Sequence, residues 1–289
     1  MATVCREALA RLNHVRTKGV QLRDLAYFPD FLILGPQRTG TTWLAKVLWR
    51  HPSIFMSFPK ELYFFNLLEK PEHPLYTSNE LKWYLSRFRD NPISFALKSF
   101  WAARRLQRAY RPLLRGEATA SYAALSQSFI HDIVTLNPSV KGIMFVRDPV
   151  ERAWSHAKKD LCRARNRHVK DVSDEEFDCF FRDPYQIACA DYAGNIQKWS
   201  AALRTGNLFI GRFEEIETDP QGLLSRLLSF LGLSTDLAFA NDFLHERINV
   251  TEDVQIADRH RAMLRDALGE RICDTWQQVS LDGPASRRF

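Results

Sequence analysis

The segment Leu32–Leu44, "LILGPQRTGTTWL", combines residue types that bind anions. A short apolar run ends at Gly35, and four residues later Gly40 precedes an expected helix over 41–50. Glycines let the backbone approach a ligand, and the first N–H groups of a helix are free to face an anion. Three hydroxyls add further donors: Thr39, Thr41 and Thr42. The segment therefore predicts a turn that binds an oxyanion.

The same turn departs from the loop that binds nucleoside triphosphates. That loop needs a lysine after its second glycine to reach the β- and γ-phosphates, and this chain has Thr41 there. The cation of this turn is Arg38. A P-loop kinase would also need an acidic residue at the end of a second strand, where the candidate, Asp148, is expected to cap a helix. A strand–turn–helix with coincidental glycines is the other alternative for this segment alone.

A second set of anion-binding residue types lies in "FVRDPVERAWSHA". Arg147 ends an apolar run over 140–146, and Ser155 follows two turns into the next expected helix. Arginine presents a planar fork of donors that fits a phosphate, and serine offers a hydroxyl. Asp148 is the expected N-cap and Glu151 completes a capping box, so Arg147 could instead pair with either carboxylate. Two such strand ends predict a ligand with two separated anionic groups.

Alternating strands and helices are expected to position these residues. Buried-type strands are predicted at 31–35, 53–57, 140–146 and 207–213, and helices at 41–50, 79–88, 129–138, 148–161, 192–203, 222–233 and 257–276. Strands separated by helices indicate an α/β fold with a central parallel sheet flanked by helices. Ligands of such sheets bind beyond the carboxyl ends of the strands. The pattern predicts one P-loop-like α/β domain.

Two segments lie outside this alternation. Residues 59–113 fit it poorly and are predicted to form a helical and loop insertion that covers one mouth of the sheet. Residues 1–29 are expected to form a basic leader helix with Val4, Ala8, Leu12 and Val15 on one face, packed on the domain or contacting a membrane surface. The start lacks the pattern of a secretory signal, and no apolar run is long enough to span a bilayer. The main domain is placed at 30–289.

Composition limits the compartment and the partners. Five cysteines without paired spacing predict free thiols in a reducing compartment, hence a soluble cytoplasmic protein. The formal charge is +6, with basic clusters at 104–115 and 158–170. These clusters are either solvated faces or an electropositive approach for an anionic ligand. No recognisable nucleic-acid module accompanies them, so no nucleic-acid partner is predicted.

Taken together, several motifs resemble those of sulfotransferases. "PQRTGTTWL" resembles the loop that cradles a 5′-phosphosulfate, and "VRDPVERAWSH" looks like the 3′-phosphate motif of the same family. "FPKELYFFN" and "RGEATASY" are similar to elements of its carbohydrate-type and bacterial members. The likeness continues through "DYAGNIQKW", "LFIGRFEEIETDP" and "RINVT", and spans roughly Asp30 to Leu264.

The resemblance implies a donor, 3′-phosphoadenosine 5′-phosphosulfate (PAPS), and a hydroxyl acceptor on a sugar, lipid or natural product, with no metal requirement. Arg38 falls at the position of the catalytic cation, and Glu61 at that of the general base. The implied donor-binding residues are Arg38, Thr39, Gly40, Thr41, Thr42, Trp43, Arg147, Ser155, Tyr192, Arg247 and Asn249. A salt bridge to Lys60 is the competing reading of Glu61, and His156 is the rival base by residue type.

The acceptor side is less constrained. Lys98, Ser121 and Tyr122 are predicted to contact substrate, against the alternatives of a surface lysine and a core tyrosine. Many relatives read "KEPHFFD", where this chain has Tyr63 and Asn66 in place of the histidine and the aspartate. The chain also lacks the paired cysteines and the anchor of the Golgi enzymes, which favours a soluble enzyme of bacterial type. A non-catalytic nucleotide- or polyanion-binding protein remains the third interpretation.

Overall fold

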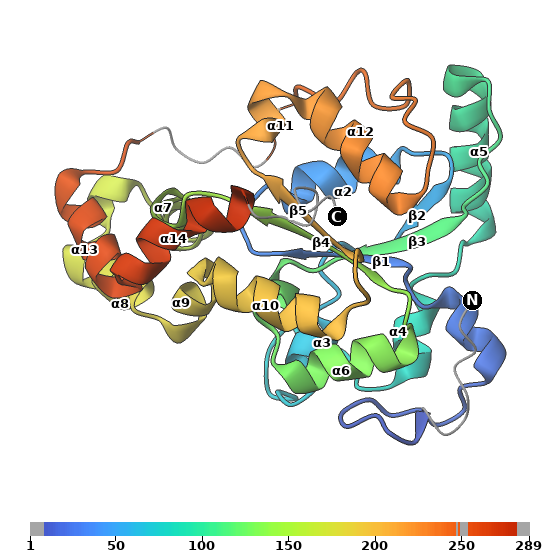
Figure 1. Ribbon diagram of the computed structural model, residues 1–289, viewed down its shortest axis with the longest axis horizontal. Coiled ribbons are helices and arrows are strands. Elements are labelled where there is room, and N and C mark those ends of the chain that lie inside the picture. The colour runs from blue at the N-terminus through green and yellow to red at the C-terminus, as the bar shows by residue number, and fades with distance from the viewer. Residues whose placement is uncertain (1–8, 247, 249–253, 282–289) are drawn as a thin grey trace.

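The computed structural model describes residues 9–281 except 247 and 249–253. Its centre is a five-stranded parallel sheet in the order β2-β3-β1-β4-β5. The strands are β1 (Phe31–Gly35), β2 (Ile54–Met56), β3 (Leu114–Ala118), β4 (Lys141–Val146) and β5 (Leu208–Arg212). Helices cover both faces of this sheet, as the alternating pattern predicts (Figure 1). The predicted α/β class with a parallel sheet is confirmed.

β1 divides the core into two layers. Leu32 and Leu34 belong to the hydrophobic cluster on one face, and Phe31 and Ile33 belong to the cluster on the other. Successive side chains of a strand point to opposite faces, so a strand without polar residues must be buried on both sides. The continuous apolar run that indicated a buried strand therefore has this physical origin.

β3 is not among the strands predicted from the sequence; it pairs with β2 on one side and with β1 on the other. Its sequence, LRGEA, has no β-branched or aromatic residue and is a poor match to strand preferences. Gly116 is needed for packing, because a Cβ there would lie 2.2 Å from Cζ of Phe31. The strand is therefore stabilised by its two neighbours rather than by its own composition.

Two helical layers cover the sheet (Figure 1). α2 (Thr41–Trp49), α11 (Glu215–Thr218) and α12 (Pro220–Leu231) lie on one face. α3 (Phe64–Leu67), α4 (Leu81–Ser86), α6 (Gln127–Leu136) and α10 (Tyr192–Ala202) lie on the other. Short 3₁₀ segments occur at Leu22–Tyr27, Ala120–Ala124, Arg163–Arg165 and Val169–Asp171, and a π-helical turn at Lys158–Cys162.

A separate helical cluster extends beyond the carboxyl ends of β4 and β5 (Figure 1). It consists of α7 (Pro149–Ala157), α8 (Asp174–Phe181), α9 (Pro184–Ala190), α13 (Asp258–Leu268) and α14 (Glu270–Leu281), and has its own hydrophobic core. The single helix predicted over 257–276 is wrong. Gly269 has a φ of 79°, a left-handed value that glycine adopts readily, and it separates α13 from α14.

The predicted insertion over 59–113 divides between two places. Its first residues reach the cleft described below, whereas α5 (Pro92–Leu106) stands beside the β2 edge of the sheet (Figure 1). The chain after α5 runs back along the start of β2, since the Leu113 N–H donates to the Ser53 carbonyl at 2.8 Å. The prediction that the whole segment covers one mouth of the sheet is therefore wrong for α5.

The described part of the leader packs on the domain. Val15 is buried in the same cluster as Leu32, and the backbone N–H groups of Asn13 and His14 donate to the buried Asp132 carboxylate at 2.9 and 3.0 Å. Leu12 and Val15 lie outside any α-helix, while Val4 and Ala8 lie outside the described residues. Between residues 9 and 281, as far as they are described, no helix is long and apolar enough to cross a bilayer.

A buried carboxyl group lies at the end of β3. Glu117 is fully buried; the Tyr84 hydroxyl donates to its Oε2, and the Thr119 hydroxyl donates to its Oε1 at 2.7 Å. Burial raises the pKa of Glu117 to about 7, although the hydrogen bonds from Tyr84, Thr119 and Tyr122 oppose this and the Glu61 charge adds to it.

This network predicts a pH dependence of stability. The pKa of Glu117 lies above its ordinary value of 4.5. Its contribution to the free energy of unfolding is therefore complete below pH 4.5 and is lost as the pH rises through about 7. We expect the free energy of unfolding to fall over this window by at most about 3 kcal/mol on account of this group. In Glu117→Gln the fall should be smaller in urea unfolding at pH 5 to 8. The exposed Glu72→Gln variant is the control, and parallel curves for wild type and Glu117→Gln would contradict the prediction.

Candidate active site

A cavity of about 860 Å³ lies beyond the carboxyl ends of β1 and β4. It is lined by the turn after β1, by the start of α7 and by the segment that follows β2. Both anion-binding segments that the sequence indicates therefore open into one space. The carboxyl ends of neighbouring parallel strands meet at one edge of the sheet, which explains why two segments far apart in sequence converge.

The glycine-rich turn has a backbone that only glycine can adopt at two positions. Gly35 has a φ of 102°, and a Cβ there would lie 2.0 Å from the Ala120 carbonyl oxygen. Gly40 has a φ of 89°, and a Cβ there would lie 2.2 Å from Cδ1 of Ile216. Gly40 is the N-cap of α2 and supplies no side-chain cap. The N-terminus of α2 thus lies at the cavity in the form that suits an anion.

The hydroxyls of the turn have different positions. Thr41 and Thr42 line the cavity. Thr39 is fully buried, and its Oγ1 donates to the Pro36 carbonyl at 2.7 Å. Thr39 therefore holds the turn in shape, whereas the prediction from the sequence placed its hydroxyl beside the ligand.

Arg38 connects the two segments that are predicted to bind anions. Its Nε donates to Ser155 Oγ at 2.9 Å, and its carbonyl accepts from Arg147 Nη1 at 3.1 Å. Ser155 Oγ accepts this bond, so its own O–H is available to donate to an anion. Burial lowers the pKa of Arg38 to about 10, with the charges of Arg147 and Arg163 adding to the effect and that of Asp160 opposing it. Arg38 is still cationic at neutral pH.

Arg147 is held at the cavity by its surroundings. Its guanidinium carbon lies 4.3 Å from the ring centroid of Phe213. Burial lowers its pKa, while Tyr192, Glu151 and Glu214 raise it. Asp148 caps α7 as predicted, accepting from the N–H groups of Val150 and Glu151 at 2.9 Å each. The alternative in which Arg147 serves only that cap is therefore not what the structure has.

Glu61 enters the cavity from the segment after β2. Its N–H donates to the Ala118 carbonyl at 2.9 Å, and its Oε2 accepts from the Ala120 N–H at 2.8 Å. These two bonds fix the residue against the end of β3. Lys60 Nζ contacts its Oε1, so the salt bridge and the place in the cavity, which were competing readings, occur together.

Trp43 and Tyr192 differ in their position relative to the cavity. Trp43 is buried, lines the wall, and donates from Nε1 to the Leu244 carbonyl at 3.1 Å. Tyr192 is buried at the start of α10 and is absent from the described lining, although it is close enough to Arg147 to affect its pKa. Arg247 and Asn249 lie outside the described residues.

The predicted substrate residues are not brought to the cavity. Tyr122 is fully buried, and its hydroxyl accepts from the Phe65 N–H at 3.2 Å, which is the core alternative. Ser121 is buried beside it and is not part of the described lining. Lys98 Nζ lies 5.0 Å from the Trp49 ring centroid, at the opposite end of α2 from the glycine-rich turn. At about 1.5 Å per residue, the nine residues of α2 separate these ends by roughly 12 Å.

Several cavity residues were not assigned to the site from the sequence. Lys158 and Lys159 line it from the π-helical turn that follows α7, and Tyr63 lines it beside Glu61. π-helical turns often occur at functional sites because they redirect side chains. The basic run at 158–170 was the available signal, and the structure brings its first two residues to the cavity. His156 does not line it; it faces Asp160, with Nε2 and Oδ2 3.1 Å apart.

The fold and this site define a class of protein: a P-loop-like α/β protein whose glycine-rich turn has an arginine and no lysine. The model of the sulfotransferase domain matches residues 28–252. The chain belongs to the sulfotransferase family.

Relatives are similar over part of their length. The chain is 26% identical over 221 residues to the bifunctional heparan sulfate N-deacetylase/N-sulfotransferase 4 of Mus musculus, covering 72% of this chain and 23% of that protein. It is 30% identical over 131 residues to the membrane-associated sulfotransferase kil1 of Dictyostelium discoideum, covering 45% of this chain and 23% of that protein. The chain thus spans about a quarter of the length of these curated relatives. The sulfotransferase structure from Alicyclobacillus acidocaldarius has the same fold, with a TM-score of 0.53 and 21% identity over 83% of this chain and 95% of that one.

Proposed function

We propose that this protein transfers a sulfuryl group from PAPS to a hydroxyl of a small-molecule or glycan acceptor. The observation that carries the proposal is the single cavity that holds Arg38, Arg147 and Ser155 on one side and Glu61 on another. A bisphosphorylated adenosine has anionic groups at both ends of its ribose. Each of the two segments that Arg38 connects would hold one of these anionic groups. Membership of the sulfotransferase family supports the proposal.

The residues present fit such a donor. The free N-terminus of α2, with Thr41 and Thr42, would hold the 5′-phosphosulfate, and Arg147 with Ser155 would hold the 3′-phosphate. The apolar part of the lining, to which Phe213 and Ile216 belong, offers a surface for the base. Arg247 and Asn249, which lie outside the described residues, are proposed from the resemblance alone to bind the donor.

Arg38 and Glu61 supply the chemistry. The acceptor oxygen attacks sulfur, the bond between sulfur and the bridging oxygen breaks, and the acceptor proton goes to the Glu61 carboxylate. The charge that develops on the bridging oxygen is stabilised by the Arg38 guanidinium. Glu61 is oriented for this role by the Ala120 N–H. The described residues contain no group of three or more side chains that could hold a metal ion, and independence from metal stays a prediction.

Two observations disfavour a P-loop kinase. The position after Gly40 is Thr41, and the Asp148 carboxylate accepts from two N–H groups of α7. Calorimetry with adenosine 3′,5′-bisphosphate (PAP), and with ATP and magnesium as comparator, separates the two functions. We expect micromolar binding of PAP and much weaker binding of ATP with magnesium; the reverse order would refute the proposal.

Arg147→Ala should mainly weaken donor binding. The variant removes a guanidinium fork that is positioned by Phe213 and by the Arg38 carbonyl. We expect the Kd for PAP to rise on the order of 30-fold, since charge-assisted hydrogen bonds contribute about 1.5–3 kcal/mol. kcat at saturating donor should change less. Arg204→Ala removes an exposed arginine as control, and a loss confined to kcat would contradict the assignment.

The acceptor class is proposed only as far as its hydroxyl. Lys60 and Tyr63 lie next to Glu61 in the chain, and Lys159 lines the same cavity. They are the acceptor-side candidates in place of Lys98, Ser121 and Tyr122. A screen of sugars, lipids and phenols with labelled donor identifies the acceptor. The four described cysteines are free thiols, which agrees with the proposed cytoplasmic location without testing it.

A further inference from the structure

Arg152 is a fully buried arginine on α7, one turn before the donor-site residue Ser155. Its Nη2 donates to the carbonyl and to Oε1 of Gln186, at 3.4 and 3.2 Å. Its Nη1 lies 3.5 Å from Nδ1 of His156. Its Nε is buried without a hydrogen-bond partner. Within the described part of the chain, the guanidinium therefore contacts neutral groups.

The carboxylates nearest to Arg152 in the chain are engaged elsewhere. Asp148 caps α7, and Glu151 Oε1 lies 2.9 Å from Arg261 Nη2. Asp160, on the far side of the His156 ring, pairs with Lys159 at 2.7 Å. None of them forms a salt bridge with Arg152 within the described ranges.

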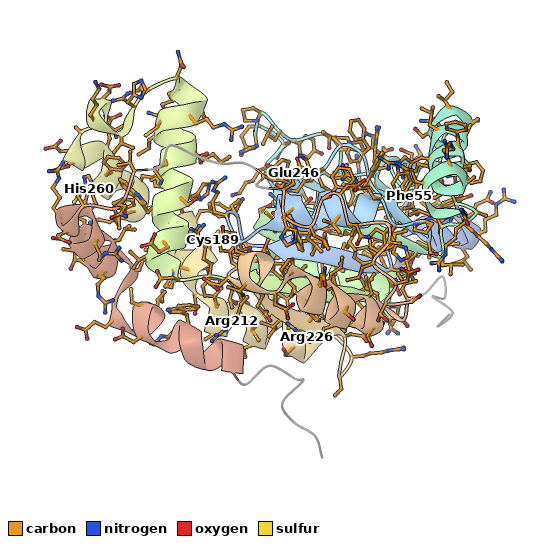
Figure 2. All side chains as sticks on the ribbon, turned by 90° about the horizontal axis from the view of Figure 1, so that it is seen from above. Phe55, Cys189, Arg212, Arg226, Glu246 and His260 are labelled. Carbon is orange, nitrogen blue, oxygen red and sulfur yellow. The ribbon has the colours of Figure 1, made fainter. Side chains whose placement is uncertain are left out.

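Gln186 belongs to a buried layer that reaches the glycine-rich turn. Cys189 Sγ, one turn further along α9, lies 3.6 Å from Oε1 of Gln37, which lines the cavity. Cys189 lies where the helical cluster meets the sheet (Figure 2). Residues three apart on a helix are neighbours on its surface, so Arg152 lies beside Ser155. Burial is the main cause that lowers the pKa of Arg147, and the Arg152 charge also lowers it.

Arg38 thus contacts Ser155 Oγ, Arg147 contacts the Arg38 carbonyl, and Arg152 lies one turn before Ser155 on α7. Arg38 and Arg147 line the cavity, whereas Arg152 is not part of the described lining. A buried ion without a counter-ion destabilises the protein that carries it. Because Arg152 is fully buried, its field is screened less than that of an exposed charge.

From this arrangement we infer that Arg152 is a positioning residue that strengthens donor binding through its field, and that the bound nucleotide is the counter-ion its burial lacks. This inference rests on the proposed donor. It adds that Arg152, which is not part of the cavity lining, destabilises the nucleotide-free protein and strengthens nucleotide binding. Removing the charge should therefore have opposite effects on the two states.

Two variants test the inference on the full chain. Arg152→Met replaces the guanidinium by an unbranched apolar side chain. Gln186→Glu keeps Arg152 and places a carboxylate where Oε1 is now 3.2 Å from Nη2. We expect both nucleotide-free variants to melt at a higher temperature than wild type, and both to bind PAP more weakly, on the order of tenfold. The ratio to wild type should persist between about 0.1 and 0.5 M salt, because a buried charge is poorly screened.

The control is Arg204→Met, which removes the same charge from an exposed arginine hydrogen-bonded to Ser139. Wild-type affinity for PAP in either test variant overturns the inference. A fall in melting temperature of the nucleotide-free Gln186→Glu protein, parallel to its loss of affinity, overturns it too, because that is the result of a merely structural role. Gln186→Glu decides alone if Arg152→Met does not fold. Failure of wild type to bind PAP instead refutes the proposed function on which the inference depends.

Discussion

Arg38→Ala should lower kcat by about 10²–10³-fold while the Kd for PAP changes less than about tenfold. The guanidinium has its strongest partner when the bond between sulfur and the bridging oxygen breaks, so its removal affects the transition state more than the bound donor. Single-turnover transfer with labelled donor gives the rate, and calorimetry with PAP gives the affinity.

Substitutions of Arg38 test its side chain and not its backbone, because the residue is already in the left-handed region, with a φ of 69°. Lysine and alanine both meet the same backbone strain as arginine there, so neither adds to it. Arg38→Lys keeps a cation and should recover much of the rate. Equal losses of rate and affinity in Arg38→Ala would contradict the proposed role, as would a lysine variant no better than alanine.

Glu61→Gln should lower kcat by about 10²–10⁴-fold, the usual contribution of a general base. Glutamine retains an oxygen that can accept from the Ala120 N–H, and the N–H of residue 61 still donates to the Ala118 carbonyl. The segment therefore keeps its place, and PAP affinity should stay within about threefold of wild type, since a neutral amide in the same shape preserves the hydrogen bond.

The matched control for this variant is Glu72→Gln, an exposed residue of the same insertion. A second variant, Lys60→Met, removes the cation that contacts Glu61 Oε1 and tests whether that contact orients the base. Undiminished turnover in Glu61→Gln would remove the base assignment. Absence of transfer in wild type would instead favour the non-catalytic interpretation.

The central sheet was predictable where burial is continuous. β1, β2, β4 and β5 lie within about two residues of the segments expected from apolar runs, because a strand buried on both faces must be apolar along its length. β3 was not predictable in this way, since LRGEA contains a glycine chosen for its contact with Phe31 and a carboxyl group stabilised by Tyr84. Both reasons depend on residues distant in sequence.

In the site, too, features that depend on short segments were predictable, and features that depend on distant residues were not. Arg38, Thr41, Thr42, Arg147 and Ser155 lie where their motifs indicated, because each motif contains its own strand end, turn and helix start. Lys98 and Tyr122 do not line the cavity. The sequence could not show this, because residue type and family position do not indicate which side of a layer a side chain faces. Lys158 and Lys159 reach it through the π-helical turn, a local departure that no spacing rule indicated.

The sequence alone indicated the class of fold and the two segments proposed to bind anions, because glycine conformation, helix N-termini and strand burial are properties of short stretches of chain. The tertiary structure decided that the two segments share one cavity, that Glu61 is fixed by the end of β3, and that Arg152 is buried among neutral partners. Each of these depends on contacts between segments distant in sequence. Only the packed sheet and its helices bring them together.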